Sequence, residues 1–163
     1  MKLVVLGGGE SGVGTAILGK QKGFEVFLSD AGSIKEHYKN VLNGQGIEWE
    51  ENQHSVDRIL QADVVMKSPG IPDKVQIVKD LLSKGVKVIS EIEFAFPFAK
   101  NISIGITGSN GKTTTTLLTH HVLKQAGLDI GIAGNIGDSY AQQIAEAPDR
   151  AYVLELSSLQ LDG

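Results

Sequence analysis

The chain of 163 residues contains no cysteine. This absence excludes disulfide bonds, catalysis by a thiolate and zinc sites with cysteine ligands, and it is typical of a reducing compartment, so we expect a cytoplasmic protein. Long hydrophobic runs are also missing. The apolar run at residues 3–6 is too short for a signal peptide, and no stretch is long enough to span a bilayer, so we expect no membrane insertion.

Positive charge and histidine are scarce as well. Fifteen basic residues against 19 acidic ones leave a formal net charge of −4, which gives no basis for binding nucleic acid. The four histidines, His37, His54, His120 and His121, show no metal-ligand spacing such as H-x-x-x-H, and we interpret all four as structural or solvated. A hydrophobic content of 41% is that of a globular protein, and the length allows one or two small domains.

Glycine, by contrast, is plentiful, with 20 residues, several of them in loops that follow apolar runs. The most informative loop reads T-G-S-N-G-K-T at residues 107–113, after a β-branched run at 102–106 that we expect to be a buried strand. Strand, glycine loop, lysine and hydroxyl in this order predict a phosphate-binding loop that opens a helix at 112–125. The strict pattern G-x-x-x-x-G-K-[ST] is not met, so we interpret the loop as a variant.

Each residue type in this loop has a task in binding a nucleoside triphosphate such as ATP. Lys112 is expected to bring a positive charge to the phosphates, and Thr113 a hydroxyl to Mg²⁺. Backbone N–H groups at the start of the helix would bind the phosphates. The expected cofactor-binding residues are Gly108, Ser109, Asn110, Gly111, Lys112, Thr113 and Thr114. The alternative is a glycine-rich turn with an incidental lysine.

A second glycine motif, G-x-G-x-x-G, occupies residues 7–12, between an apolar strand at 3–6 and a predicted helix at 13–21. The next predicted strand, 25–29, is closed by Asp30. This arrangement is the fingerprint of a dinucleotide-binding fold, in which a phosphate lies at the start of the helix and the acid bonds a ribose or a base. A structural turn that merely begins a βαβ unit is the alternative.

Strands and helices continue to alternate along the chain. Further strands are predicted at 47–49, 63–66, 86–89, 130–133 and 151–154, and further helices at 33–42, 56–60, 75–82 and 139–145. The pattern predicts the α/β class: a Rossmann-like parallel-sheet domain at 1–92, an interdomain hinge at 93–100 and the first part of a P-loop ATP-binding α/β domain at 101–163. Residues 91–100 interrupt the alternation, and we assign no chemistry to Glu91 and Glu93.

In an open parallel sheet, ligands bind beyond the carboxyl ends of the strands, so the loops after residues 106, 133 and 154 are expected to face one crevice. Glu155 follows the last apolar strand, and with Thr113 it is expected to hold the Mg²⁺ that bridges the terminal phosphates. A carboxylate that faces water is the alternative. Asn135, in the loop G-N-I-G, is either a turn residue or a ligand contact.

Several of these motifs, in this order, resemble the Mur ligase family, and the resemblance covers essentially the whole chain. The motifs are G-x-G-x-S-G at 7–12, S-P-G-I at 68–71, E-I-E at 91–93, T-G-S-N-G-K-T at 107–113, G-N-I-G at 134–137 and E-L-S-S-L-Q-L at 155–161. G-N-I-G and E-L-S-S-x-Q-L favour the branch of this family that adds D-glutamate.

The resemblance implies an ATP-dependent, ADP-forming amide ligase of peptidoglycan synthesis. ATP would phosphorylate the carboxylate of UDP-N-acetylmuramoyl-L-alanine, and the amine of D-glutamate would attack the acyl phosphate. Lys112 and Glu155 would be catalytic, and Thr113 and Glu155 would bind Mg²⁺. The implied substrate-binding residues are Gly9, Glu10, Ser11, Gly12, Asp30, Gly70, Asn135 and Ser157. Among them, the loop at 9–12 would hold the UDP diphosphate and Asp30 would contact the uracil. The full-length enzyme would be a monomer.

Two features depart from the family pattern. Ala31 and Gly32 stand where relatives have further polar contacts to the uracil. The family also continues far beyond residue 163, with a metal-binding histidine, a modified lysine and a third domain that helps bind ATP and D-glutamate. We therefore expect an amino-terminal part of a longer enzyme that is inactive alone and exposes apolar surface after residue 100. The rival interpretations are an NAD(P)-dependent oxidoreductase, a stand-alone P-loop NTPase and a non-catalytic nucleotide-binding module.

Overall fold

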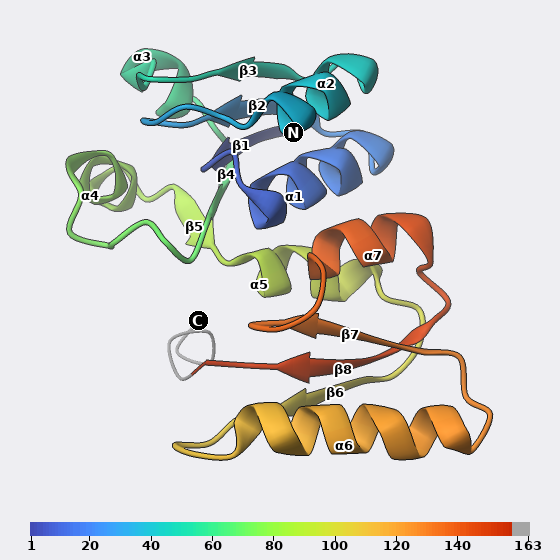
Figure 1. Cartoon of the computed structure of the whole chain (residues 1–163). Coiled ribbons are helices and arrows are strands. Elements are labelled where there is room, and N and C mark those ends of the chain that lie inside the picture. The colour runs from blue at the N-terminus through green and yellow to red at the C-terminus, as the bar shows by residue number, and fades with distance from the viewer. Residues whose placement is uncertain (158–163) are drawn as a thin grey trace.

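The computed structural model describes residues 1–157, which form two parallel β-sheets with helices between and outside them (Figure 1). The larger sheet has five strands in the order β3-β2-β1-β4-β5, all parallel. Its strands are β1 (Lys2–Leu6), β2 (Glu25–Ser29), β3 (Glu48–Glu50), β4 (Val64–Lys67) and β5 (Lys87–Ile89). The predicted α/β class with parallel sheets is confirmed.

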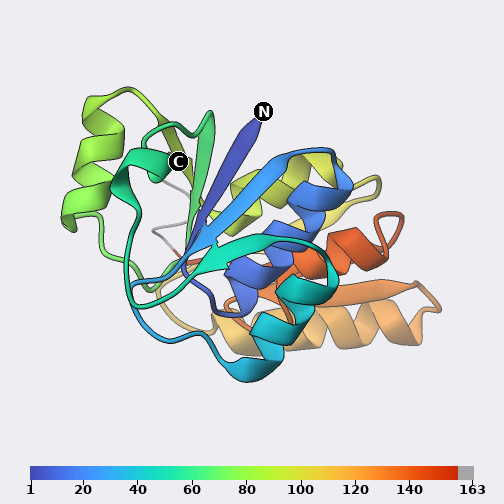
Figure 2. The same cartoon turned by 90° about the horizontal axis from the view of Figure 1, so that it is seen from above.

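Strand β1 lies at the centre of this sheet because its residues are apolar on both faces. Leu3 and Val5 pack into one cluster with residues of α1 (Glu10–Gln21) and α2 (Glu36–Gly44), whereas Val4 and Leu6 pack into another. The second cluster includes residues of α3 (Val56–Ile59) and α4 (Gln76–Ser83). Seen from above in Figure 2, α4 lies on one side of the strands and α1 and α2 lie on the other. A continuous apolar strand is thus buried by helices on both sides.

The smaller sheet has three parallel strands in the order β6-β8-β7. Helix α6 covers one face of the sheet, and α7 with α5 covers the other (Figure 1). The elements are β6 (Ser103–Ile106), α6 (Lys112–Gln125), β7 (Ile130–Gly134), α7 (Tyr140–Glu146) and β8 (Ala151–Glu155). The expectation that the strand before the phosphate loop is buried is wrong. β6 is half-buried to exposed because it forms the edge of the sheet, while β8 holds the buried centre.

Two short helices, α5 (Glu91–Ala95) and η1 (Phe96–Phe98), connect the sheets in a segment for which the sequence predicted no element. Helix α5 begins with a capping box: the Ser90 hydroxyl accepts from the Glu93 backbone N–H, and the Glu93 carboxylate accepts from the Ser90 N–H. The pattern S-x-x-E at 90–93 is a signal that predicts such a start. Phe94 then packs between the rings of Phe24 and Phe98, each with its centroid 5.6 Å away.

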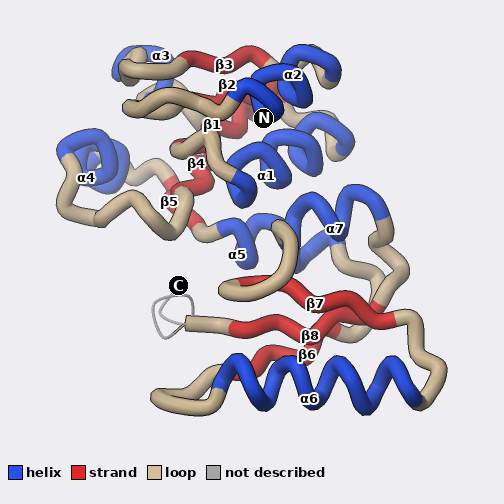
Figure 3. The backbone as a smooth tube through the Cα atoms, in the orientation of Figure 1, coloured by secondary structure: helices blue, strands red, loops and turns tan. Residues whose placement is uncertain are grey.

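Helices and strands alternate along the chain (Figure 3). Helix α6 has the predicted bounds, and most other elements start or end within one to three residues of the predicted position. Helix α1 begins at Glu10 rather than at residue 13, so residues 10–12 form its first turn. One cluster of buried residues includes members of both sheets, and α7 packs against α1. The division into 1–92, 93–100 and 101–163 stays a prediction. Within residues 1–157 no helix is both long enough and apolar enough to cross a membrane.

Candidate functional site

The loop between β6 and α6 has the geometry of a phosphate cradle. Gly111 precedes the first helical residue with φ 74°, a left-handed conformation that a residue with a Cβ rarely adopts. The Lys112 ammonium donates to the Gly108 carbonyl oxygen at 2.7 Å, so the side chain curls back over the loop. Ser109, Asn110, Thr113 and Thr114 are exposed. The first N–H groups of α6 and one lysine therefore converge on an open loop, where an anion can bind.

Glu155 lies at the carboxyl end of β8, the middle strand of the smaller sheet. The strand register places it beside Ile106 of β6 and Gly134 of β7, so it stands between the phosphate loop and the loop after β7. Its side chain is only 5% exposed, and the oxygen Oε2 has no hydrogen-bond partner among residues 1–157. The alternative of a carboxylate facing water does not fit this burial. A buried oxygen without a donor is destabilising unless a ligand compensates it.

The residues around this loop fit a magnesium ion that is shared with phosphates. Mg²⁺ prefers oxygen ligands and usually takes one or two carboxylates together with phosphate oxygens and water. The Glu155 carboxylate has a free oxygen, and the Thr113 hydroxyl is exposed at the start of α6. In the part of the chain that the structure describes, no group of three or more His, Cys, Asp or Glu residues could hold a metal ion by itself.

The loop after β7 adjoins Glu155 through the backbone. The Asn135 N–H donates to the Glu155 carbonyl oxygen at 2.9 Å, and the Asn135 residue is exposed at the same sheet edge. Ser157 follows β8 and is half-buried. The remaining residues of the motif, 158–161, lie outside the described part of the chain. The structure thus brings Asn135, Glu155 and the phosphate loop to one edge of the smaller sheet.

The glycine motif of the larger sheet forms a tight turn at the start of α1. A Cβ on Gly12 would collide with the carbonyl oxygen of Gly7, so the turn closes only with glycine at this position. Asp30, at the end of β2, fixes the same turn from the other side: its Oδ2 accepts from the Gly8 N–H at 2.5 Å, and its Oδ1 accepts from the Gly32 N–H at 2.7 Å. Both carboxylate oxygens of Asp30 therefore already hold backbone groups.

A cavity of about 500 Å³ opens beyond the carboxyl ends of β1, β2 and β4. The residues that line it include Gly7, Asp30, Gly70, Ile71 and His54. In Figure 1 the loop from β4 to α4 and the loop before α6 both lie on the left side of the molecule. Gly70 and Asp30, two of the predicted substrate-binding residues, thus share one cavity.

His54, which the sequence analysis interpreted as structural or solvated, also lines this cavity, a position that the sequence did not predict. It is half-buried, and its Nδ1 lies 2.7 Å from the Ser29 hydroxyl. No motif surrounds this histidine in the sequence, so no local signal could have found it. By contrast, His120 is structural as expected, with its Nε2 3.2 Å from the Ile130 carbonyl oxygen.

A buried carboxylate, that of Glu50, is linked to His54 through the Ser29 hydroxyl. It accepts hydrogen bonds from the Ser29 hydroxyl at 2.6 Å, the Ser55 N–H at 2.7 Å and the Ser55 hydroxyl at 2.6 Å. Burial acts to raise the pKa of Glu50, but the hydrogen bonds from Ser29 and Ser55 outweigh it and hold the pKa below its usual value. The carboxylate is therefore charged at neutral pH.

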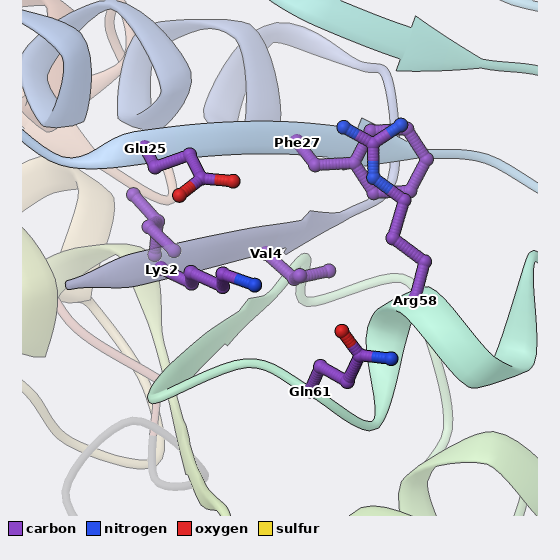
Figure 4. A pocket seen from close by; sticks show the side chains of 7 residues that line it. Lys2, Val4, Glu25, Phe27, Arg58 and Gln61 are labelled. Atoms are coloured by element: carbon purple, nitrogen blue, oxygen red, sulfur yellow. The ribbon is translucent and has the colours of Figure 1, made fainter.

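A second cavity, on the α3 side of the larger sheet, is too small to hold a nucleotide (Figure 4). It has a volume of about 40 Å³ and is lined by residues that include Lys2, Val4 and Arg58. The Arg58 guanidinium lies over the Phe27 ring, 3.7 Å from its centroid. A space of this size holds one or a few water molecules.

Two carboxylates, those of Glu10 and Glu91, accept hydrogen bonds from the start of α7. The Ser139 hydroxyl and the Ala141 N–H both donate to Glu91 Oε1, at 2.6 and 2.9 Å. The Ser139 N–H donates to Glu10 Oε1 at 3.0 Å. The side chain of Glu10, a predicted substrate-binding residue, is thus engaged with α7, whereas the backbone of residues 9–12 forms the turn and the helix start. Glu91 has a structural role as a cap.

Comparison with known proteins matches both halves of the chain to one group of enzymes. Residues 2–77 match the family model of the MurD N-terminal domain, and residues 106–162 match that of the Mur ligase middle domain. The chain is 59% identical over 162 residues to the UDP-N-acetylmuramoylalanine--D-glutamate ligase of Christiangramia forsetii, and 55% identical over 161 residues to that of Bacteroides fragilis. Each alignment covers 99% of this chain but 36% of the relative, so the chain spans little more than a third of the relatives' length.

A solved structure with the same arrangement is the UDP-N-acetylmuramate:L-alanyl-gamma-D-glutamyl-meso-diaminopimelate ligase from Neisseria meningitides. It is 25% identical to this chain, with a TM-score of 0.58. The superposition covers 95% of this chain and 52% of that one. The likeness therefore extends over both sheets.

Proposed function

Because the chain belongs to the Mur ligase family, we propose that it carries two binding elements of an acid–amino-acid ligase. The whole enzyme would join D-glutamate to UDP-N-acetylmuramoyl-L-alanine in the cytoplasm, with ATP and Mg²⁺ as cofactors. The names of the relatives support these substrates. Since the chain spans 36% of the relatives' length, we expect that it does not complete the reaction alone.

The observation that carries the proposal is the buried Glu155 carboxylate beside the phosphate loop. Its Oε2 has no partner among residues 1–157, and a cation bound together with the triphosphate would stabilise it. Lys112 and the N-terminus of α6 supply the positive charge that the phosphates need. A phosphate loop with a strand-end acid next to it is the arrangement that triphosphate chemistry requires.

In this proposal each residue has a defined task. Lys112 leaves the Gly108 carbonyl and bonds the phosphates, while the loop N–H groups orient them. Thr113 and Glu155 would hold Mg²⁺, which when bound withdraws negative charge from the terminal phosphates. Asn135 lies at the same edge as Glu155, where its amide can bond the substrate that receives the phosphoryl group.

The first half of the chain would hold the UDP part of the substrate. N–H groups at the start of α1, residues 9–12, would bind the diphosphate. Asp30 would contact the uracil, and Gly70 would line the path of the muramoyl group. The interpretation as an NAD(P)-dependent oxidoreductase depends on the first glycine motif alone and does not explain the phosphate loop at residues 107–113. A stand-alone P-loop NTPase leaves the first half without one. Neither alternative is favoured, because both halves match the same family.

Calorimetric titration of the chain with MgATP tests the proposal. We expect Lys112→Ala to weaken binding at least tenfold, because the ammonium contacts the phosphates directly. Lys124→Ala, at the exposed far end of the same helix, is the matched control and should bind as the wild type does. Glu155→Gln should remove most of the dependence of binding on Mg²⁺. Equal affinity of the Lys112 and Lys124 variants contradicts the proposal.

A second titration separates the proposal from its oxidoreductase rival. The wild-type chain is titrated with UDP-N-acetylmuramoyl-L-alanine and, in parallel, with NADH. We expect heat of binding with the uridine nucleotide and none with NADH. Binding of NADH alone would favour the oxidoreductase.

A further inference from the structure

The cavity at the end of β1, β2 and β4 has the size and lining of a nucleoside site. Its volume of about 500 Å³ lies in the range of pockets that bury small ligands. Val56, Ile71 and Pro72 supply apolar surface for the face of a ring, and Asp30 and His54 are polar groups at the strand-end side. Apolar walls with few polar groups favour a flat, partly polar ligand.

The hydrogen bonds behind His54 fix the position of its proton. The Ser29 hydroxyl has a single proton and lies 2.6 Å from Glu50 Oε1 and 2.7 Å from His54 Nδ1. Glu50 is charged and only accepts, so Ser29 donates to Glu50 and must accept from His54. The Gln53 carbonyl oxygen, at 3.4 Å from the Ser29 hydroxyl, is a weaker acceptor. The His54 nitrogen that faces Ser29, Nδ1, is therefore the one that carries a proton.

The other ring nitrogen, Nε2, is then a hydrogen-bond acceptor for which residues 1–157 supply no donor. Within residues 1–157 the His54 ring makes its hydrogen bond through Nδ1. Asp30, the neighbouring polar group, already accepts the Gly8 and Gly32 N–H groups on its two oxygens. His54 thus lines the cavity with a ring that is held through Nδ1 and with no partner for Nε2 among residues 1–157.

We propose that His54 is a specificity-determining residue for the nucleoside of the bound nucleotide: its Nε2 accepts a hydrogen bond from the uridine in this cavity. The inference rests on the proposed function, which supplies the uridine nucleotide. A uridine has two kinds of donor, the N–H of the uracil ring and the hydroxyls of the ribose. Cytidine lacks that N–H, and 2′-deoxyuridine lacks the 2′-hydroxyl, so the two nucleosides distinguish the ring N–H from the 2′-hydroxyl.

The test is calorimetric titration of the wild type and of His54→Ala with UDP, CDP and 2′-deoxy-UDP. We expect His54→Ala to weaken UDP binding about tenfold, the effect of one lost hydrogen bond in a partly buried site. The analogue that lacks the donor should bind both proteins equally. His37→Ala is the matched control, because His37 is an exposed histidine of α2 that stacks on Tyr38, and it should leave all affinities unchanged.

Two outcomes overturn the inference while leaving the proposed function intact. In one, His54→Ala binds UDP with wild-type affinity. In the other, His54→Ala loses affinity for inorganic pyrophosphate by the same factor, so the effect is on the diphosphate and not on the nucleoside. A wild-type chain that binds no uridine nucleotide overturns the proposed function as well. If His54→Ala does not fold, as judged by circular dichroism, His54→Gln replaces it. Its side-chain oxygen should retain part of the discrimination between UDP and the analogue.

A nuclear magnetic resonance measurement tests the network itself. The ¹⁵N shifts of the His54 ring in the wild type should report a proton on Nδ1. In Ser29→Ala the Nδ1 partner is lost, so the two tautomers should mix, and UDP affinity should fall by a smaller factor than in His54→Ala. A wild-type ring protonated on Nε2 instead would overturn the inference, because no acceptor would face the nucleoside.

Discussion

Three glutamates are buried among the residues that the structure describes, and their partners distinguish their roles. Glu50 accepts hydrogen bonds on both carboxylate oxygens, and Glu91 accepts two on its Oε1, from the Ser139 hydroxyl and the Ala141 N–H. Glu155 retains an oxygen without a partner. A buried carboxylate with all its donors in place stabilises the fold, whereas one with an open oxygen is prepared for a ligand. The hydrogen-bond partners of a buried glutamate therefore indicate whether it has a structural role or a ligand-binding role.

The lowered pKa of Glu50 predicts a dependence of stability on pH. A carboxyl group with a depressed folded-state pKa contributes stability above its unfolded value of about 4.5, and this contribution is lost as the pH falls through the folded pKa. We expect the melting temperature of the wild type to fall more steeply below pH 4.5 than that of Glu50→Gln, which cannot titrate at this position. Glu25→Gln, an exposed residue of β2, is the control and should follow the wild-type curve. Parallel curves for the wild type and Glu50→Gln contradict the prediction.

The candidate phosphate loop was predictable from the sequence because its members are neighbours in the chain. Gly111, Lys112 and Thr113 are consecutive in the sequence. The prediction that Glu155 lies near them required only the rule that the carboxyl ends of parallel strands lie at one edge of a sheet. His54 was not predictable, since its partner Ser29 is 25 positions away. The bond between Ser139 and Glu91 spans 48 positions. Pairings of this kind arise from tertiary packing, which no local pattern contains.

At the scale of elements, hydrophobic periodicity identified strands and helices but not their exposure. Residues 3–6 predicted a central strand, and β1 is one, because an apolar residue at every position requires cover on both faces. The run at 102–106 was expected to be buried too, but it alternates isoleucine with serine and glycine, and β6 lies at a sheet edge. The order of strands in a sheet depends on crossovers that the sequence does not reveal. Helix α5 was missed because aromatic residues and a proline obscured its capping box.

The start of α7 depends on Glu91, which gives a prediction for this element. Glu91→Ala leaves the Ser139 hydroxyl without its acceptor and the Ala141 N–H unpaired in a buried place. We expect it to lower the free energy of unfolding by about 2–4 kcal/mol, measured by urea denaturation. Glu91→Gln keeps an oxygen acceptor and should lower it by less. The matched control is Glu146→Ala, at the exposed end of the same helix, which should change the stability little.

Across residues 1–157, five of the ten exposed large apolar side chains lie after residue 100, and three of these lie together on α6. Leu117, Leu118 and Val122 on α6 are each more than half exposed, and Ile102 and Leu128 nearby in the sequence are exposed as well. Helix α6 covers the smaller sheet with its other side. Patches of this kind favour association in water.

We therefore expect the isolated chain to self-associate with rising concentration. Sedimentation velocity should show larger species that disappear in the double variant Leu118→Gln/Val122→Gln. Leu82→Gln, which removes an exposed leucine from α4, is the control and should sediment as the wild type does. A wild-type chain that stays monomeric at all concentrations contradicts the prediction.

Glu10 and Glu91 both accept hydrogen bonds from the start of α7, and these bonds limit how the two sheets can move apart. Rotation about residues 93–100 would draw Glu10 and Glu91 away from Ser139 and leave the first turn of α7 without acceptors in a dry interface. These hydrogen bonds consequently connect the glycine turn at residues 7–12, which begins α1, to the loop at residues 134–139, which precedes α7. We therefore expect these two loops to move together, because the hydrogen bonds of Ser139 connect the start of α7 to both α1 and α5.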